Sequence, residues 1–115
     1  MVIGAAYVPK RGDLVWITFT PQVGYEQAGR RSALVISLAT YNGKVGLVLL
    51  CLVTSRAKGY PFEVALPSGL GIEGVVLSDQ VKSLDWRARN AERFAVLPGA
   101  ALQEVLGKLG ALIGN

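Results

Sequence analysis

The sequence predicts a mainly β fold: a compact, strongly bent sheet or small barrel that is completed by one helix. Through the first two-thirds of the chain, short runs rich in β-branched and aromatic residues alternate with Gly, Pro and Asn turns. Near the end, apolar residues recur at three- and four-residue steps, which is the period of a helix. Several short strands followed by one helix are typical of a curved sheet or barrel.

The first strands are bounded by clear turn residues. Residues 14–19 form an apolar and aromatic run that stops before Pro21. Residues 33–38 and 45–54 flank Asn42-Gly43, and an Asn-Gly pair between apolar runs predicts a tight β-hairpin. We therefore expect these two runs to be antiparallel neighbours.

The later strands and the helix are predicted from Gly and Pro breaks and from the spacing of apolar residues. Further strands are expected at residues 62–66, 74–77 and 79–86. One amphipathic helix is expected from Gly99 to Ile113, after Pro98 and before Gly114. Its apolar stripe suits either a dimer surface or packing against the chain's own sheet. Phe62, Trp16 and Trp86 are expected to fill the core.

Length and composition indicate one folded domain over residues 1–115. Half the residues are hydrophobic (51%), which argues against intrinsic disorder. The longest apolar run, Val45 to Val53, is far shorter than the roughly 20 residues needed to cross a bilayer. No basic residue precedes the short apolar start, so no signal peptide is expected. We therefore expect a cytoplasmic location.

Cysteine, histidine and charge narrow the chemistry. Cys51 is the only cysteine and is expected to be a buried, inert thiol. The chain has no histidine, so it lacks the commonest general base and metal ligand, and no metal or cofactor is expected. The net charge of +4 and the bias toward arginine favour a polyanionic partner.

One glycine-flanked loop, residues 24–31, concentrates charged groups just before an apolar strand. It holds Glu26, Arg30 and Arg31. A guanidinium stays protonated and can grip two phosphate oxygens, while a carboxylate can accept a proton. Glu26 as base and Arg31 as clamp would suit metal-free RNA cleavage, although an ordinary surface ion pair is the alternative.

Four blocks in order resemble the MazF/PemK toxin family. They are Gly12-Asp13-Leu14-Val15-Trp16, Glu26-Gln27-Ala28-Gly29-Arg30-Arg31, residues 58–64 and residues 79–89. The resemblance implies a small SH3-like (CcdB/PemK-like) β-barrel that works as a homodimer. It also implies a ribosome-independent, metal-independent endoribonuclease that cuts single-stranded mRNA at a short sequence, leaving a 2′,3′-cyclic phosphate and a 5′-hydroxyl. A cognate MazE-like antitoxin with a flexible acidic tail would neutralise it.

The resemblance assigns roles by position. Arg31 closes the family's E-Q-A-G-x-R block as the catalytic arginine, and Thr54 ends the long central strand as its partner. Arg31 would stabilise the charge on the phosphate, and Thr54 would donate or relay a proton. Glu26 is the candidate general base. The residues expected to contact RNA are Tyr25, Gln27, Arg30, Ser55, Arg56, Lys58, Lys82, Arg87 and Arg89.

Three departures from the family pattern bear on the recognised sequence. Arg30 stands where some relatives have histidine, and Ser32 stands where proline is frequent. Tyr25 precedes the glutamate where a small polar residue is common, and its ring could stack on an unpaired base. The resemblance therefore does not specify which RNA sequence is cut.

Two other functions are alternatives. A CcdB-like toxin shares the implied fold but poisons DNA gyrase by protein binding, and it relies on a tryptophan near the C-terminus. This chain ends Leu112-Ile113-Gly114-Asn115, without one. A module that only binds RNA is the other alternative, and the presence of Arg31, Thr54 and Glu26 together counts against it.

Overall fold

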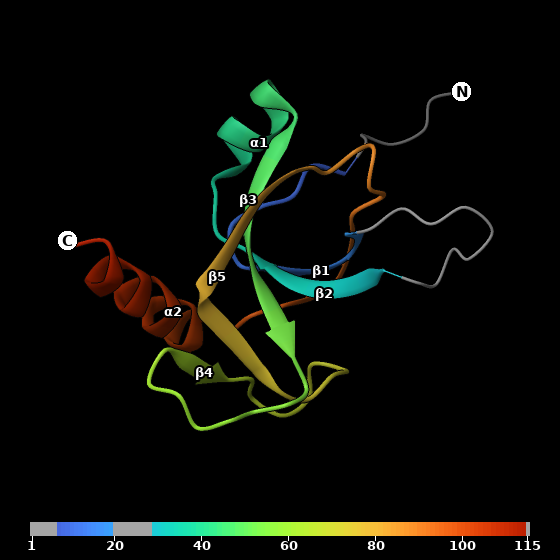
Figure 1. The fold of residues 1–115 in the computed structure, drawn as a ribbon. Helices are drawn as coiled ribbons and strands as arrows, with labels where there is room; N and C mark the ends of the chain where they lie inside the picture. The colour runs from blue at the N-terminus through green and yellow to red at the C-terminus, as the bar shows by residue number, and fades with distance from the viewer. Residues whose placement is uncertain (1–6, 20–28, 115) are drawn as a thin grey trace.

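A curled, six-stranded antiparallel sheet and two helices make up the structure, a computed structural model that describes residues 7–19 and 29–114 (Figure 1). The strand order β4-β5-β3-β2-β1-β6 leaves β4 and β6 at the edges, and the sheet curls into a half-barrel. The elements are β1 Asp13–Thr18, β2 Arg30–Val35, α1 Ala39–Val45, β3 Leu47–Thr54, β4 Glu63–Ala65, β5 Val75–Asp85, β6 Glu92–Val96 and α2 Gly99–Leu112.

The sheet bends where β3 meets β5. Cys51 pairs with Val81, but Val53 pairs with Val76, so Leu52 alone faces residues 77–80 of β5. Extra residues on one strand bend it and increase its twist. Beyond this irregularity, β5 continues alongside both β3 and the short β4. The bend brings the Thr54 end of β3 next to the β4 region.

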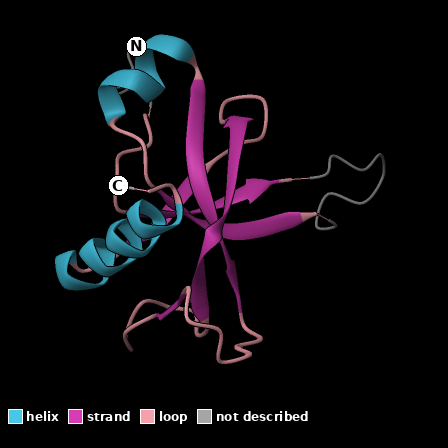
Figure 2. Ribbon diagram, turned by 60° about the vertical axis from the view of Figure 1, so that its left-hand side comes forward, coloured by secondary structure: helices cyan, strands magenta, loops and turns pink. Residues whose placement is uncertain are grey.

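Apolar side chains are buried on both faces of the sheet, because neighbouring residues of each central strand point in opposite directions. One cluster includes Leu14, Leu34, Cys51 and residues Ala101 and Val105 of α2. The other includes Val15, Val35, Val48, Leu50 and Trp86. Burial on two faces explains the unbroken apolar run of β3. Figure 2 shows α1 and α2 at separate places along the curled sheet.

Most of the predicted elements are present, with changed bounds. The mainly β fold and the C-terminal helix are confirmed. The α2 stripe packs against β4 and β5 of its own chain. The strands expected at 74–77 and 79–86 are one continuous strand, β5, and β6 was not predicted. Cys51 is fully buried, as expected.

The predicted Asn-Gly hairpin is wrong, although β2 and β3 are antiparallel neighbours as expected. The connection is the short helix α1, which ends at Gly46 in the left-handed conformation (φ 83°). The Asn42 amide is buried and donates to the carbonyl oxygens of Pro9 (2.7 Å) and Ser37 (3.2 Å). It also accepts from the Ser37 hydroxyl at 2.5 Å. Asn42 is therefore a core polar residue rather than a turn residue.

Candidate functional site

Arg31 and Thr54 line one cleft at the open end of the β2–β3 pair. This Arg31–Thr54 cleft has a volume of about 500 Å³. Its lining residues are Trp16, Arg30, Arg31, Ser32, Val53, Thr54, Ser55 and Arg56. The cleft therefore combines three arginines with three hydroxyl-bearing side chains.

Strand register explains why two residues distant in sequence meet there. Ala33 of β2 pairs with Leu52 of β3 in an antiparallel register. Two residues further along each strand, in opposite chain directions, lie Arg31 and Thr54. Both side chains are accordingly carried by the rigid sheet. The sequence predicts that Arg31 lies in a loop, but it belongs to β2, where its side chain is exposed.

The Thr54 hydroxyl has a defined hydrogen-bond role. Its Oγ1 accepts from the backbone N–H of Arg56 at 3.1 Å, which leaves the hydroxyl hydrogen available for another acceptor. Gly74 packs closely behind this residue: a Cβ there would stand 2.1 Å from the Thr54 carbonyl oxygen, and Gly74 has φ 133°. Only glycine fits both constraints. Gly74 therefore supports the position of Thr54, although it does not line the cleft itself.

The adjacent arginines of β2 differ in their surroundings. The Arg30 guanidinium donates to Thr18 Oγ1 (3.0 Å), to the carbonyl oxygen of Asn90 (2.8 Å) and to Glu92 (2.6 Å), so protein oxygens occupy much of it. The hydrogen bonds found among the described residues include none from the guanidinium of Arg31. Of these two arginines, Arg31 is therefore the one whose guanidinium has no hydrogen-bond acceptor among the described residues and can bind an anion.

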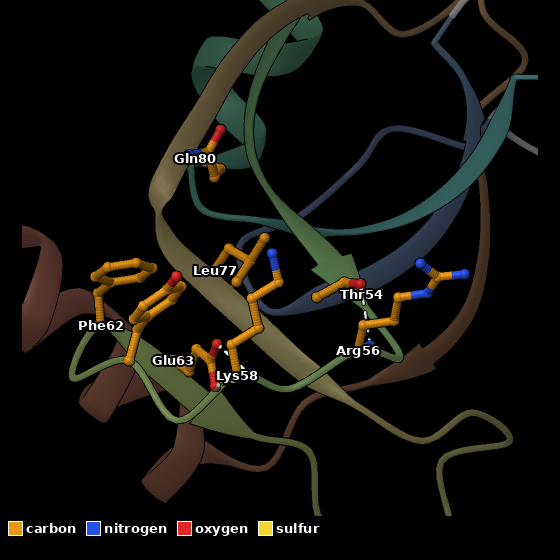
Figure 3. Close-up of a pocket in the computed structure, with 8 residues that line it drawn as sticks. Thr54, Arg56, Lys58, Phe62, Glu63, Leu77 and Gln80 are labelled. Atoms are coloured by element: carbon orange, nitrogen blue, oxygen red, sulfur yellow. Dashed lines mark hydrogen bonds between the residues drawn. The ribbon is translucent and has the colours of Figure 1, made fainter.

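A second cleft adjoins the first and shares Thr54 and Arg56 with it. This Tyr60–Phe62 cleft has a volume of about 310 Å³, and its other lining residues are Lys58, Tyr60, Phe62, Glu63, Leu77 and Gln80. The rings of Tyr60 and Phe62 are stacked, with centroids 5.3 Å apart. Figure 3 shows the Lys58 side chain extending from its loop toward Leu77 on β5. Cationic, aromatic and amide groups thus face one continuous depression.

The other residues predicted to contact RNA lie in several environments. Ser55, Arg56 and Lys58 are exposed beside the two clefts. Lys82 and Arg87 are exposed but line neither cleft, and the Arg87 guanidinium lies 4.6 Å from the Trp86 ring centroid. The Arg89 guanidinium donates to the carbonyl oxygens of Thr18 and Phe19. Glu26, Tyr25 and Gln27 lie outside the described residues.

Two aromatic residues differ from the sequence prediction. Trp86 is buried as expected, but Trp16 is 36% exposed, packs against Phe94 with the two rings tilted by 32°, and lines the Arg31–Thr54 cleft. Phe62 is half-buried and lines the second cleft instead of filling the core. The alternation in β1 was the available signal for Trp16, because its neighbours Val15 and Ile17 both face the opposite side of the sheet.

Few described groups have shifted titration. Burial, with Asp79 adding to it, raises the pKa of the Cys51 thiol to about 11, so this cysteine stays protonated and inert. Among residues 7–19 and 29–114, no three His, Cys, Asp or Glu side chains are grouped to hold a metal ion. No helix within those ranges is long and apolar enough to cross a membrane.

The sequence matches one protein family over almost its whole length. The family is described as the PemK-like, MazF-like toxin of type II toxin-antitoxin system, and residues 10–113 match. The endoribonuclease toxin MazF of Escherichia coli K12 is 49% identical over 108 residues, covering 94% of this chain and 96% of that protein. The endoribonuclease PemK of Escherichia coli is 34% identical, covering 90% and 81%. The gyrase-directed alternative is not favoured by these matches.

Solved structures agree with the fold. The crystal structure of MazF from Deinococcus radiodurans has a TM-score of 0.86 and 62% identity, covering 96% of this chain and 100% of that one. A MazE–MazF crystal structure from the same organism has a TM-score of 0.85 and 57% identity, covering 95% and 98%. The half-barrel and its C-terminal helix are therefore the architecture of these relatives.

Proposed function

Because this chain belongs to the PemK-like, MazF-like family of type II toxins, we propose that it is a toxin with endoribonuclease activity. It cuts single-stranded mRNA at a short sequence, without the ribosome and without a metal ion. The products are a 2′,3′-cyclic phosphate and a 5′-hydroxyl. These finer features rest on the resemblance, and the geometry of Arg31 and Thr54 supports the cleavage chemistry among them.

The observation that carries the proposal is the meeting of Arg31 and Thr54 in one exposed cleft, with Arg56 beside them. A permanently charged guanidinium stabilises the negative charge that builds on the phosphate oxygens in the transition state. A hydroxyl whose lone pair is engaged by a backbone N–H has its hydrogen free to donate. Both groups stand on adjacent strands, which fixes their separation.

The chemistry balances without a cofactor. The ribose 2′-oxygen attacks phosphorus while its proton passes to a base, for which Glu26 is the candidate. The bond from phosphorus to the 5′-oxygen breaks, and that oxygen takes the Thr54 hydroxyl proton to leave as the 5′-hydroxyl, while Thr54 recovers a proton from solvent water. Arg31 binds the non-bridging oxygens throughout. No electron transfer is involved.

RNA would run from this cleft into the Tyr60–Phe62 cleft. Arg56 lies at the junction and Lys58 beyond it, which gives the backbone a series of cations. Aromatic rings bind unpaired bases by stacking, and an amide such as that of Gln80 can read a base edge. The second cleft is thus proposed as the site for a neighbouring nucleotide.

Partner proteins follow from the same premise. The crystal complex from Deinococcus radiodurans contains MazE with MazF. We propose that this chain is a homodimer, acts in the cytoplasm where mRNA is found, and is neutralised by a MazE-like antitoxin. An acidic tail on that antitoxin would suit the +4 net charge of the chain.

The test is direct cleavage of a long unstructured RNA by purified protein in the presence of EDTA. New 5′ ends at a recurring short motif, absent with Arg31→Ala, are expected. An RNA that stays intact with the parent protein, with or without added Mg²⁺, would refute the ribonuclease proposal. Cleavage that EDTA stops and a metal restores would refute its metal independence.

A further inference from the structure

Lys108 of α2 reaches across to the segment that leads into β4. Its ammonium Nζ donates to the carbonyl oxygen of Pro61 at 2.7 Å and to that of Glu63 at 3.0 Å. It also lies 3.4 Å from the Glu104 carboxylate on the same helix. The two carbonyls flank Phe62, so one charged side chain fixes the backbone on either side of that ring.

Glu63 also holds this segment together, through hydrogen bonds to other residues within it. Its carboxylate accepts from the backbone N–H of Lys58 (3.0 Å) and of Gly59 (3.1 Å). Its own N–H donates to the carbonyl oxygen of Tyr60 at 3.1 Å. Residues 58–63 are therefore a closed turn whose ends are tied by one side chain.

Few other hydrogen bonds hold this turn, although the rings of Tyr60 and Phe62 stack on each other. Between the end of β3 and the start of β4, residues Ser55 to Pro61 are all exposed, and β4 is only three residues long. Before the pairing of β4 with β5 begins at Glu63, one backbone bond ties the segment to β5, from the Ser78 N–H to the Phe62 carbonyl oxygen at 3.2 Å. Hydrogen bonds from a charged group are stronger than neutral ones, so Lys108 and Glu63 contribute a large part of what orders the turn.

We propose that Lys108 and Glu63 are positioning residues that hold Lys58, Tyr60 and Phe62 as the wall of the Tyr60–Phe62 cleft. They thereby set how tightly the neighbouring nucleotide is bound. The inference rests on the proposed function, because it takes that cleft as an RNA subsite. It assigns to Lys108, which lines neither of the two clefts, an effect on RNA affinity. The reacting groups Arg31 and Thr54 stand on the sheet and do not depend on the turn.

The test compares Lys108→Met with the parent, using a short RNA that contains one cut motif. Met keeps most of the apolar stem and removes the charged donor. Because a binding-competent turn is then populated only part of the time, KM is expected to rise about tenfold with kcat nearly unchanged. Lys108→Arg should restore the parent KM, since a guanidinium can also donate to both carbonyls. Glu104→Gln, which removes only the ion pair, and Lys44→Met, on α1, are the matched controls and should leave KM unchanged.

A second variant and a second measurement guard against misfolding and against failure of the ribonuclease proposal. Glu63→Gln keeps the shape of the side chain and weakens its two backbone contacts, so it should raise KM and speed amide exchange at Lys58 and Gly59. Binding of an uncleavable 2′-deoxy analogue, measured in the same variants, should weaken about tenfold. This assay decides the positioning role even if the parent does not cut.

Three outcomes would overturn the inference: an unchanged KM in folded Lys108→Met and Glu63→Gln, a fall in kcat alone, or no binding of the analogue by the parent. Failure of cleavage with variant-sensitive binding would reject the ribonuclease and keep the positioning role.

Discussion

The two ends of the β2–β3 pair carry polar side chains that are used in opposite ways. At the α1 end, Asn42 and Ser37 are buried and bonded to each other, to Pro9 and to the Leu49 N–H. The Trp86 indole donates to the Asn42 carbonyl oxygen at 2.9 Å. At the other end, Arg31 and Arg56 are exposed around a cleft.

The difference is one of satisfied against available hydrogen-bonding capacity. Buried polar groups must be paired inside the protein, because an unpaired one keeps its full desolvation cost. Such groups stabilise the fold and leave nothing for a ligand. Exposed donors such as Arg31 on β2 and Arg56 just after β3 are solvated, and they can exchange water for a phosphate. We therefore expect substitutions at the two ends to separate stability from activity.

Arg31→Ala gives the largest expected change. Without the guanidinium, kcat/KM for RNA cleavage should fall about 1,000-fold, because a preorganised charge on the transition state is lost. The melting temperature should change little, since the side chain is exposed. Arg30→Ala is the contrast: it removes bonds to Thr18, Asn90 and Glu92 and should lower the free energy of unfolding by about 1 kcal/mol. Equal activity of Arg31→Ala and the parent would reject the catalytic assignment.

Asn42→Ala tests the other end. It leaves the Ser37 hydroxyl and the Pro9 carbonyl oxygen without their buried partner, so the free energy of unfolding should fall by about 3 kcal/mol. Urea denaturation measures this loss, and Thr40→Ala, exposed on the same helix, is the control. The remaining folded protein should cleave RNA normally. A stable variant with poor activity would reverse the comparison.

Thr54→Val removes the hydroxyl and keeps the shape of the side chain. We expect kcat to fall about 100-fold, as when a proton-transfer group is lost. Thr54→Ser keeps the donor and should retain most activity. Single-turnover cleavage separates this step from RNA binding. If Val and Ser variants are equally active, the hydroxyl takes no part in proton transfer.

Alkaline pH should weaken the core rather than the cleft. The Cys51 thiol ionises near its ordinary pKa of 9 in the unfolded chain but near 11 when folded. As pH rises, the unfolded chain therefore loses the Cys51 proton first. The thiol's contribution to the free energy of unfolding is complete below pH 9 and falls by about 2 kcal/mol as pH rises toward 11. Burial and the Asp13 hydrogen bond also raise the pKa of Tyr7, with the same sign. Urea denaturation across this range should show a shallower decline for Cys51→Ala, and identical slopes would contradict the assignment.

Arg56→Gln is the smallest expected effect. Loss of one phosphate contact should make the dependence of log affinity on log salt less steep by about 0.7 for a single strand. Fluorescence anisotropy with the uncleavable RNA analogue measures it. Lys44→Gln, a cation at the end of α1, should leave the slope unchanged. A change with Lys44 and none with Arg56 would place the RNA elsewhere.

The sequence by itself predicted the mainly β fold, the C-terminal helix and the pair of Arg31 and Thr54. These signals are local. Alternating apolar runs, a helical period and a family motif can be recognised without knowing which distant segments pack together. Local signals failed at Asn42-Gly43, where the turn propensity of Asn was outweighed by buried hydrogen bonds to Pro9 and Ser37.

Only the tertiary structure decided how the predicted residues are used. Strand register, a long-range property, brought Arg31 to Thr54 and gave Arg30 its protein partners. The bend of β5 and the reach of Lys108 to Pro61 and Glu63 formed the second cleft's wall. A sequence states which groups a chain carries, whereas the packing of distant segments determines which of those groups are satisfied within the protein and which remain for a ligand.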